Sequence, residues 1–337
     1  MNSNRSAIVN VESNHKMVAE GASEEEGPDR FLPARACSLA AQAMRFRDEW
    51  NALYSGYFGR FEDTTKIPNM RFTWKKPTLN ESPMPTATLQ IFSLKVAKIR
   101  GGLQWPLHLF GKVAVRDVVD HNRNMIFDCP RESCQFLTQE DPYLKLTGPT
   151  RAVVLVDPVT IEVDLQVKGV TKDEDENLSF LAVTYTNFAS LQSKLFKRDY
   201  ANMCSTMEFE LASIVLSVEA TISLQVRPGS GSWPDGYRAL FSARTASIGK
   251  AEVILLDSGD DKVCIAGEGT ISLSRCVASV EISGKLEVCV KSGRGEFLVS
   301  GSKFFKPKKY GASHDDLPLD FCTLDITVKW SLVSTSL

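Results

Sequence analysis

The stretch Thr88-Leu89-Gln90-Ile91-Phe92-Ser93-Leu94 decides the fold, because the chain returns to it twice. A related stretch, Thr206-Met207-Glu208-Phe209-Glu210-Leu211, follows 118 positions later, and Thr323-Leu324-Asp325-Ile326-Thr327-Val328 follows 117 positions after that. Apolar and polar residues alternate in these stretches, which is typical of a β-strand with one buried face. The chain therefore contains an internal β repeat.

Two further landmarks recur in the same order. Trp105-Pro106 is echoed by Trp233-Pro234, and the alternating segment 163–168 is echoed by the segment 286–291. This order indicates a duplicated β unit rather than chance similarity. We expect the third return, near the C-terminus, to complete the sheet of the second unit and to cover an otherwise bare edge.

Hydrophobic residues make up 43% of the 337 residues and charged residues 24%, the proportions of a soluble globular protein. A chain of this length forms one large or two ordinary domains with a sizeable core. The formal net charge of −2 gives no global attraction to nucleic acid or to an anionic membrane. An anionic partner would have to bind at a local basic patch.

The N-terminal segment 1–31 is polar and acidic, and we expect a disordered tail. It has no apolar core of a signal peptide, and no apolar run in the chain approaches the ~18 residues of a membrane span. We therefore expect a cytoplasmic protein, with the nucleus as an alternative, that is not secreted. The eight cysteines should then be reduced thiols.

A helix is predicted over residues 32–60, followed by an extended linker over 61–85. In the helix, apolar residues recur at steps of four and three, which places them on one face: Leu39, Ala43, Phe46, Trp50, Leu53 and Tyr57. We expect this face to dock on the β units or on a neighbour. In the linker, Pro77, Pro83 and Pro85 each fix φ and remove a hydrogen-bond donor.

From residue 86 onward, alternation with a period of two predicts short antiparallel strands separated by turns. The fold class expected is mainly β, with two internally duplicated, sandwich-like units preceded by one amphipathic helix. Copy one should span 86–204 and copy two 205–337, and the two copies are allowed to form one compact domain.

Several motifs in order resemble an uncharacterised plant family of unknown function that is abundant in grasses. They are Leu89–Val96, Gly102–Pro106 with Ala114–Asp117, Asp141–Arg151, Gly231–Gly236 and Leu255–Asp260. The resemblance covers roughly residues 61–333. It implies an association with stress or defence, because family members also occur fused to ribosome-inactivating rRNA N-glycosidase domains. It implies no catalytic residues.

The N-glycosidase signature itself is absent from this chain. That signature needs a helical Glu followed by Ala-Ala-Arg, and the nearest match, Glu219-Ala220-Thr221-Ile222, lacks the Arg and has a strand pattern. We therefore interpret the chain as a companion module without the toxin.

The sharpest enzymatic motif is Asp257-Ser258-Gly259 at the end of an apolar strand. Aspartic proteases present one of two paired carboxylates in this way. The first copy has Asp128-Cys129-Pro130 at the matching place, without Ser-Gly. A turn stabilised by the Asp side chain and the Gly conformation is the favoured interpretation.

Acidic loops raise the alternative of calcium binding, through Asp117, Asp120 and Asp128 in copy one and Asp257, Asp260 and Asp261 in copy two. Solvated turns are the favoured interpretation of these loops. No cysteine or histidine spacing typical of zinc occurs. We therefore assign no metal ligands, no catalytic residues and no cofactor.

Two features are candidates for ligand contacts. The basic-aromatic stretch contributes Lys303, Phe305, Lys306, Lys308, Lys309 and Tyr310, whose lysines suit phosphates and whose rings suit bases. An edge strand protected by lysines and a proline is the favoured alternative. Trp105 and Trp233 are interpreted as structural corners, with carbohydrate stacking as the alternative.

The function that these observations favour is a non-enzymatic interaction or accessory module of a stress- or defence-associated plant family. An unknown protein is the partner we expect first, RNA or the ribosome second, and neither a membrane nor DNA. The alternatives are a companion module of rRNA N-glycosidases and a carbohydrate- or calcium-binding β-sandwich.

Overall fold

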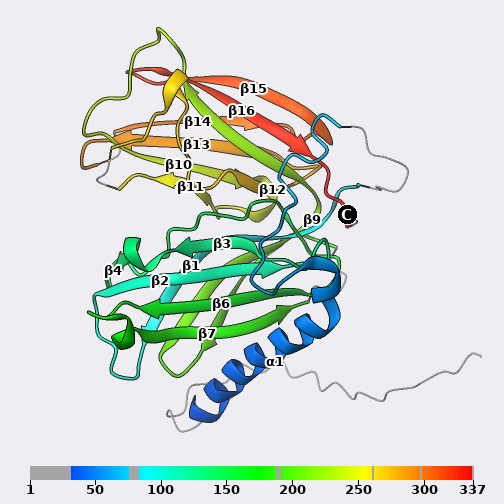
Figure 1. Cartoon of the computed structure of the whole chain (residues 1–337). Helices are drawn as coiled ribbons and strands as arrows, with labels where there is room; N and C mark the ends of the chain where they lie inside the picture. Colours follow the sequence, from blue (N-terminus) through cyan, green and yellow to red (C-terminus); the bar gives the residue numbers. More distant parts are fainter. Residues whose placement is uncertain (1–31, 76–82, 187–190, 260–261, 297, 336–337) are drawn as a thin grey trace, which may run out of the picture. The chain divides into compact units, whose positions relative to one another are not determined.

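One long strand, β9 (Ser205–Val226), takes part in both halves of the molecule (Figure 1). The computed structural model describes residues 32–75, 83–186, 191–259, 262–296 and 298–335, with side chains from residue 39 onward. The predicted tail 1–31 and Pro77 lie outside the described residues. The first part of β9 pairs with β1 (Thr86–Ile99) and β8 (Lys194–Ala201), and its second part with β12 (Val277–Glu281) and β16 (Thr323–Ser331).

The first half has two sheets around one core. One sheet has the order β5 (Val153–Val154), β1, β9, β8. The other has the order β3 (Asn124–Cys129), β2 (Leu107–Arg116), β6 (Val159–Val167), β7 (Glu176–Tyr185), with β4 (Gln135–Leu137) also on β2. Alternate residues of both sheets, such as Leu94, Val115, Ile161 and Phe209, form the core.

The second half is built in the same way. Its two sheets have the orders β12, β9, β16, β15 (Tyr310–Pro318) and β11 (Val253–Asp257), β10 (Arg238–Thr245), β13 (Leu286–Gly293), β14 (Val299–Phe305). Val218, Phe241, Val288 and Trp330 belong to a second, separate core. Four 3₁₀ turns interrupt the loops of the described residues at Arg131–Ser133, Lys172–Glu174, Ala246–Ile248 and Gly267–Gly269.

The order of strand pairing repeats from one half to the other. The pairs β1–β5, β1–β9 and β8–β9 correspond to β9–β12, β9–β16 and β15–β16. The predicted mainly β fold with antiparallel sheets is confirmed. The expectation that the C-terminal strand covers a bare edge is wrong, because β16 lies between β9 and β15 and the outer position belongs to β15.

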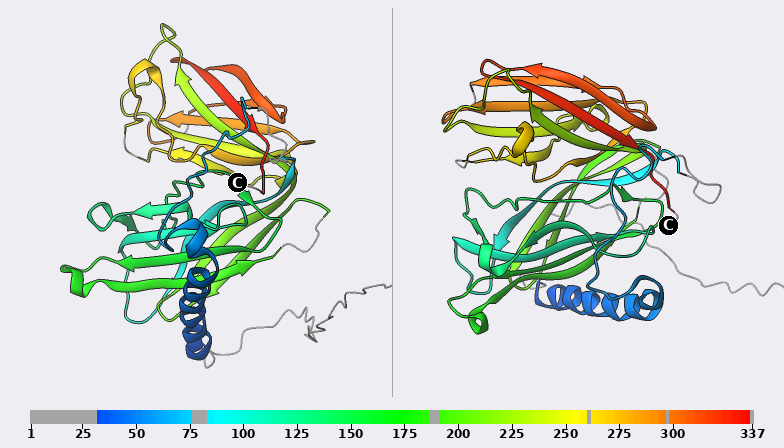
Figure 2. Two further views of the ribbon diagram at one scale, coloured as in Figure 1. Left: turned by 45° about the vertical axis from the view of Figure 1, so that its right-hand side comes forward. Right: turned by 45° about the horizontal axis from the view of Figure 1, so that its top comes forward.

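The predicted helix is present as α1 (Leu32–Phe58), and it packs against β7 on the outside of the first half (Figures 1 and 2). Trp50 is 2% exposed, and its indole Nε1 donates to the carbonyl of His121 at 2.7 Å. The Arg116 guanidinium lies 4.9 Å from the Trp50 ring and 4.1 Å from the Phe61 ring. The two rings also pack edge to face, with centroids 5.5 Å apart, so a cation beside an aromatic pair anchors the helix.

The C-terminal part of the helix face differs from the prediction. Leu53 and Tyr57 are 63% and 86% exposed, so their predicted burial is wrong. Tyr54 and Phe58 pack in their place, with the Tyr54 ring stacked on His121 at 3.9 Å. An α-helix makes one turn every 3.6 residues, whereas alternating steps of four and three average 3.5 residues. The buried face therefore shifts by one position toward the end of the helix, from Leu53 and Tyr57 to Tyr54 and Phe58. None of the described helices is long and apolar enough to cross a membrane.

The segment after the helix, residues 60–75, contacts both halves. Phe61 packs on Arg116 in the first half, as described above. Phe72 is 2% exposed, and its backbone N–H donates to Ser331 Oγ at 3.0 Å in the second half. The backbone N–H of Met70 donates to the Glu219 carboxylate in the middle of β9 at 2.7 Å. We call this stretch the crossing segment.

Replacing Trp50 by Ala should lower the free energy of unfolding by about 3–5 kcal/mol, because it empties a buried site and removes a ring from Arg116. Tyr57→Ala, on the exposed face of the same helix, should change it by less than about 0.5 kcal/mol. Urea denaturation followed by circular dichroism measures both. Equal effects of the two changes would contradict this docking of α1.

Candidate functional site

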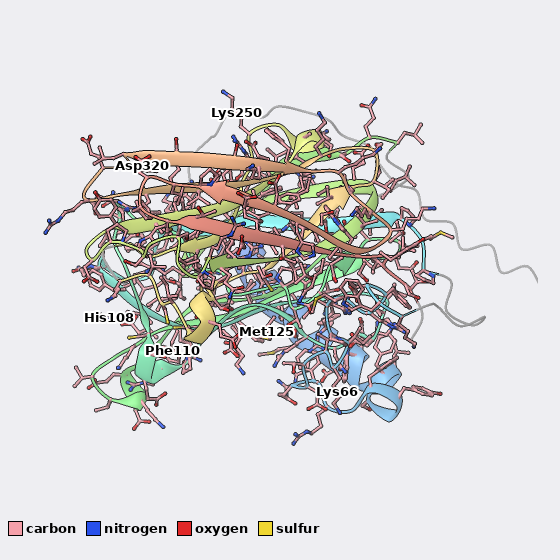
Figure 3. The ribbon with its side chains drawn as sticks, turned by 90° about the horizontal axis from the view of Figure 1, so that it is seen from above. Lys66, His108, Phe110, Met125, Lys250 and Asp320 are labelled. Carbon is pink, nitrogen blue, oxygen red and sulfur yellow. The ribbon has the colours of Figure 1, made fainter. Side chains whose placement is uncertain are left out.

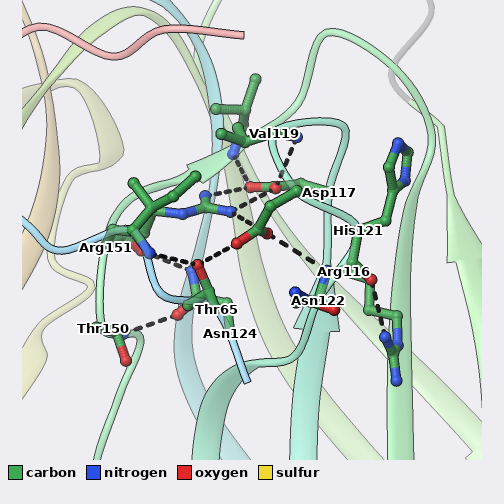
Figure 4. A network of polar contacts seen from close by, with 12 residues as sticks. Thr65, Arg116, Asp117, Val119, His121, Asn122, Asn124, Thr150 and Arg151 are labelled. Carbon is green, nitrogen blue, oxygen red and sulfur yellow. Dashed lines mark hydrogen bonds and ion pairs between the residues drawn. The ribbon is translucent and has the colours of Figure 1, made fainter. Parts of the chain in front are cut away.

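Asp117 and Asp120, two of the acids for which calcium binding was the alternative interpretation, are buried and held by an arginine, so the favoured interpretation as solvated turns is wrong for them (Figure 4). Arg151 forms a two-bonded ion pair with Asp117 at 2.7 and 2.8 Å and a further contact with Asp120 at 3.1 Å. Asp117 also accepts the backbone N–H of Val154 at 2.9 Å. Burial alone would lower the pKa of Arg151, but the two carboxylates outweigh it and raise the pKa above its ordinary value.

This ion-pair cluster joins separate parts of the chain. The hydroxyl of Thr65, in the crossing segment, donates to Asp120 at 2.5 Å. Glu219 of β9 accepts the backbone N–H of Ala152 at 2.7 Å, next to Arg151. The carboxylates therefore already have protein partners, and the arrangement is that of a structural clamp. Among the described residues, no group of three or more His, Cys, Asp or Glu side chains is placed to hold a metal ion.

The Asp257-Ser258-Gly259 motif forms a turn. The Asp257 carboxylate accepts the backbone N–H of Gly259 at 3.0 Å, and Gly259 has a positive φ of 56°. Ser258 is 7% exposed, and its hydroxyl oxygen accepts the backbone N–H of Ala239 at 2.9 Å. Asp128, at the matching place in copy one, is exposed. Asp260 and Asp261 lie outside the described residues.

The basic-aromatic stretch spans the end of β14, a turn and the start of β15. Phe305 is 4% exposed and belongs to the core, so its ring is not accessible to a base. Lys303 lies 3.1 Å from Asp315. Lys306, Lys308, Lys309 and Tyr310 are exposed, and Tyr310 has an exposed fraction of 69%.

Phe304 of the same stretch is also 63% exposed, and the fold brings a further exposed aromatic residue to this turn. The backbone N–H of Gly311 donates to the carbonyl of Thr73 at 2.9 Å, which places the crossing segment beside the start of β15. Trp74, next in the chain, is 72% exposed. We call the group formed by Trp74, Lys306, Lys308, Lys309 and Tyr310 the end surface. Trp74 was missed because it lies in a stretch interpreted as a linker.

The two Trp-Pro corners are partly buried. Trp105 packs against the core of the first half. The Trp233 indole packs on Phe241 and Phe321, at 5.6 and 5.0 Å between ring centroids, and donates to the carbonyl of Tyr237 at 3.2 Å. These contacts are those of rings that stabilise a bend.

A family model described as "Domain of unknown function (DUF6598)" matches residues 88–328. The chain belongs to the DUF6598 family. The match begins in β1 and ends in β16, so the family's domain includes strands of both halves. No curated protein matches the DUF6598 chain.

Some solved structures are distantly similar. Human GIVD cytosolic phospholipase A2 is 8% identical with a TM-score of 0.24, and the similarity covers 75% of this chain and 31% of the phospholipase chain. The two C2 domains of extended-synaptotagmin 2 are 8% identical with a TM-score of 0.24, over 80% of this chain and 100% of theirs. The DUF6598 chain thus spans about 31% of the phospholipase's length.

Changing Arg151 to Met should destabilise the DUF6598 chain by about 3–5 kcal/mol, because it leaves Asp117 and Asp120 buried without their cation. The matched control is Arg227→Met, which removes an exposed ion pair with Asp325 and should cost at most about 1 kcal/mol. Urea denaturation of both variants gives the two free energies. A cost for Arg151→Met no larger than that of the control would contradict the clamp.

His121 should make the docking of α1 sensitive to pH. Burial lowers its pKa, an effect that Asp117 and Asp120 only partly oppose. The neutral ring therefore stabilises the fold fully above the unfolded-state value near 6.5, and this contribution is lost as the pH falls through the lower folded-state pKa. We expect the melting temperature to fall more between pH 7 and pH 5 in the wild type than in His121→Asn.

Asn suits this test because it tolerates the positive φ of 52° at position 121. The same pH dependence in both proteins would show that His121 is not responsible.

Proposed function

We propose that this chain is a non-enzymatic interaction module whose end surface binds single-stranded RNA. The observation that carries the proposal is the placement of Trp74, 72% exposed, beside the turn that carries Lys306, Lys308, Lys309 and Tyr310. Exposed rings are stacking platforms for bases, and lysines neutralise the phosphates between them.

The composition of the end surface favours RNA over a protein partner. Trp and Tyr are enriched at protein interfaces, but Lys is depleted there, whereas three of the five residues of this surface are lysines. The positive charge is local, since the chain as a whole has a formal net charge of −2. Binding would therefore be confined to this surface.

The biological setting is part of the same proposal. The sequence motifs resemble those of plant proteins that accompany rRNA N-glycosidase domains, in a context of stress or defence. A module with that history would meet RNA on or near the ribosome. In this proposal the chain supplies binding, and any chemistry on the RNA belongs to a separate protein.

The test is fluorescence anisotropy of a labelled single-stranded RNA oligonucleotide with the full chain. Trp74→Ala and Tyr310→Ala should each weaken binding by about 1–3 kcal/mol, the contribution of one stacked base. Replacing Lys308 and Lys309 together by Gln should also weaken the salt dependence of binding. The slope of the logarithm of the binding constant against the logarithm of the salt concentration should become shallower by about 1.4, because each lost phosphate contact contributes about 0.7 for single strands.

Two variants serve as matched controls. Tyr57→Ala removes an aromatic ring that is 86% exposed on α1. Lys250→Gln removes an exposed lysine of the second half, which is labelled in Figure 3. This lysine is distant in sequence from the turn between β14 and β15. Both should bind like the wild type. Equal losses in test and control variants, or no saturable RNA binding by the wild type, would sink the proposal; affinity for a protein partner at the same surface would replace it.

A further inference from the structure

A cleft of about 410 Å³ lies where the two halves meet. Its walls come from β1, from the loop after β4, from β11 and from the residues just before β12. Apolar side chains line much of it, including Phe92, Leu144, Leu146 and Leu256. A volume of this size suits a small molecule.

Arg275 lies in the wall of this cleft and is 3% exposed. Its guanidinium donates from Nη2 to the carbonyl of Ile91 at 2.7 Å and, weakly, from Nη1 to that of Phe92 at 3.4 Å. Its Nε has no hydrogen-bond partner in the part of the chain that the structure describes. The side chain thus has N–H donors to spare. Burial lowers the pKa of Arg275 to about 10, and no charge among the described residues opposes this.

Comparison with the first half shows which partners Arg275 lacks. Thr150-Arg151-Ala152 precedes β5, which begins at Val153, and Ser274-Arg275-Cys276 precedes β12, which begins at Val277, so the two arginines stand at matching positions. Arg151 binds the carboxylates of Asp117 and Asp120, which follow β2. The turn that follows β10 has Ala246-Ser247-Ile248 instead, without an acid. At this position the second copy therefore keeps the buried cation without the two acids that follow β2 in the first.

We propose that the cleft is a binding site for a small carboxylic acid with an apolar body, whose carboxylate pairs with Arg275. Charge-assisted hydrogen bonds between guanidinium and carboxylate are strong, and the apolar wall would cover the rest of the ligand. The acid takes the place that Asp117 and Asp120 have at Arg151. This site is separate from the end surface, and it does not depend on RNA binding.

The charges around the cleft restrict the ligand further. The side chains of Glu210, Glu252 and Asp257 also line it. Asp141 and Lys145 line it as well, and Glu252 and Asp257 are paired with Arg244 and Arg238 at 3.6 and 3.5 Å. The acids of the lining outnumber its cations, which disfavours a ligand with several negative charges. A ligand with one carboxylate that reaches Arg275 is compatible with this lining.

The test is isothermal titration calorimetry of the full chain with phenylacetate and with phenylacetamide, its uncharged counterpart. Phenylacetate should bind at least about tenfold more tightly than the amide. Hexanoate and N-acetylphenylalanine extend the test to other monocarboxylates. No saturable binding by any of the three acids at millimolar concentration, or equal binding of acid and amide, would overturn the proposal.

The variant Arg275→Met assigns the binding to this residue. It removes a buried charge that has no carboxylate partner among the described residues, which offsets the loss of the hydrogen bonds to the carbonyls of Ile91 and Phe92, so it should fold with a melting temperature close to that of the wild type. It should bind phenylacetate at least about tenfold more weakly, while Lys250→Gln binds it like the wild type. Unchanged binding by folded Arg275→Met would place the ligand elsewhere and refute the site.

Discussion

The sharing of β9 between two cores is the constraint on which the rest of the structure depends. Its backbone pairs with β1 and β8 along one part and with β12 and β16 along the other. Between these parts Leu216 has a positive φ of 45°, unusual for a residue with a side chain. The strand changes sheet partners at this point, so each half gains a central strand from the same segment.

The two halves have the same order of strand pairing, but arginines at matching positions have different partners in each. In the first half, Arg116 and Arg151 both have carboxylate partners: Arg116 pairs with Glu162 beside the Trp50 and Phe61 rings, and Arg151 holds Asp117 and Asp120. This polar chemistry fixes α1 and the crossing segment onto the sheets. Within the described residues of the second half, no helix corresponds to α1, and the matching cation has no carboxylate. A ligand is therefore expected to bind at Arg275, where the carboxylate partners found at Arg151 are absent from the described residues.

The alternation and spacing of the repeats were sufficient to predict the sheets and the helix, because both depend on local periodicity. The exposed position of Tyr57 follows from the 3.6-residue helical turn, but the stacking of Tyr54 on His121, far away in sequence, was not predictable. The place of Trp74 beside the start of β15 was not predictable, because it depends on long-range contacts such as the hydrogen bond from the Gly311 N–H to the carbonyl of Thr73. The repeated Ser/Thr-Arg pair before β5 and β12 is visible in the sequence. The different roles of the two arginines became clear only from the partners of each guanidinium in the structure.

Because β9 is shared, the sequence repeat and the folded half do not have the same boundary. The second repeat begins with β9, but the first folded half needs the same strand. A cut between residues 204 and 205, where the repeat in sequence begins again, would take from the first half the strand that separates β1 from β8. That half would then have two bare edges facing each other across the space of one missing strand. Such a fragment would be an acceptor for any extended peptide that alternates like residues 205–214, including the same segment of another copy.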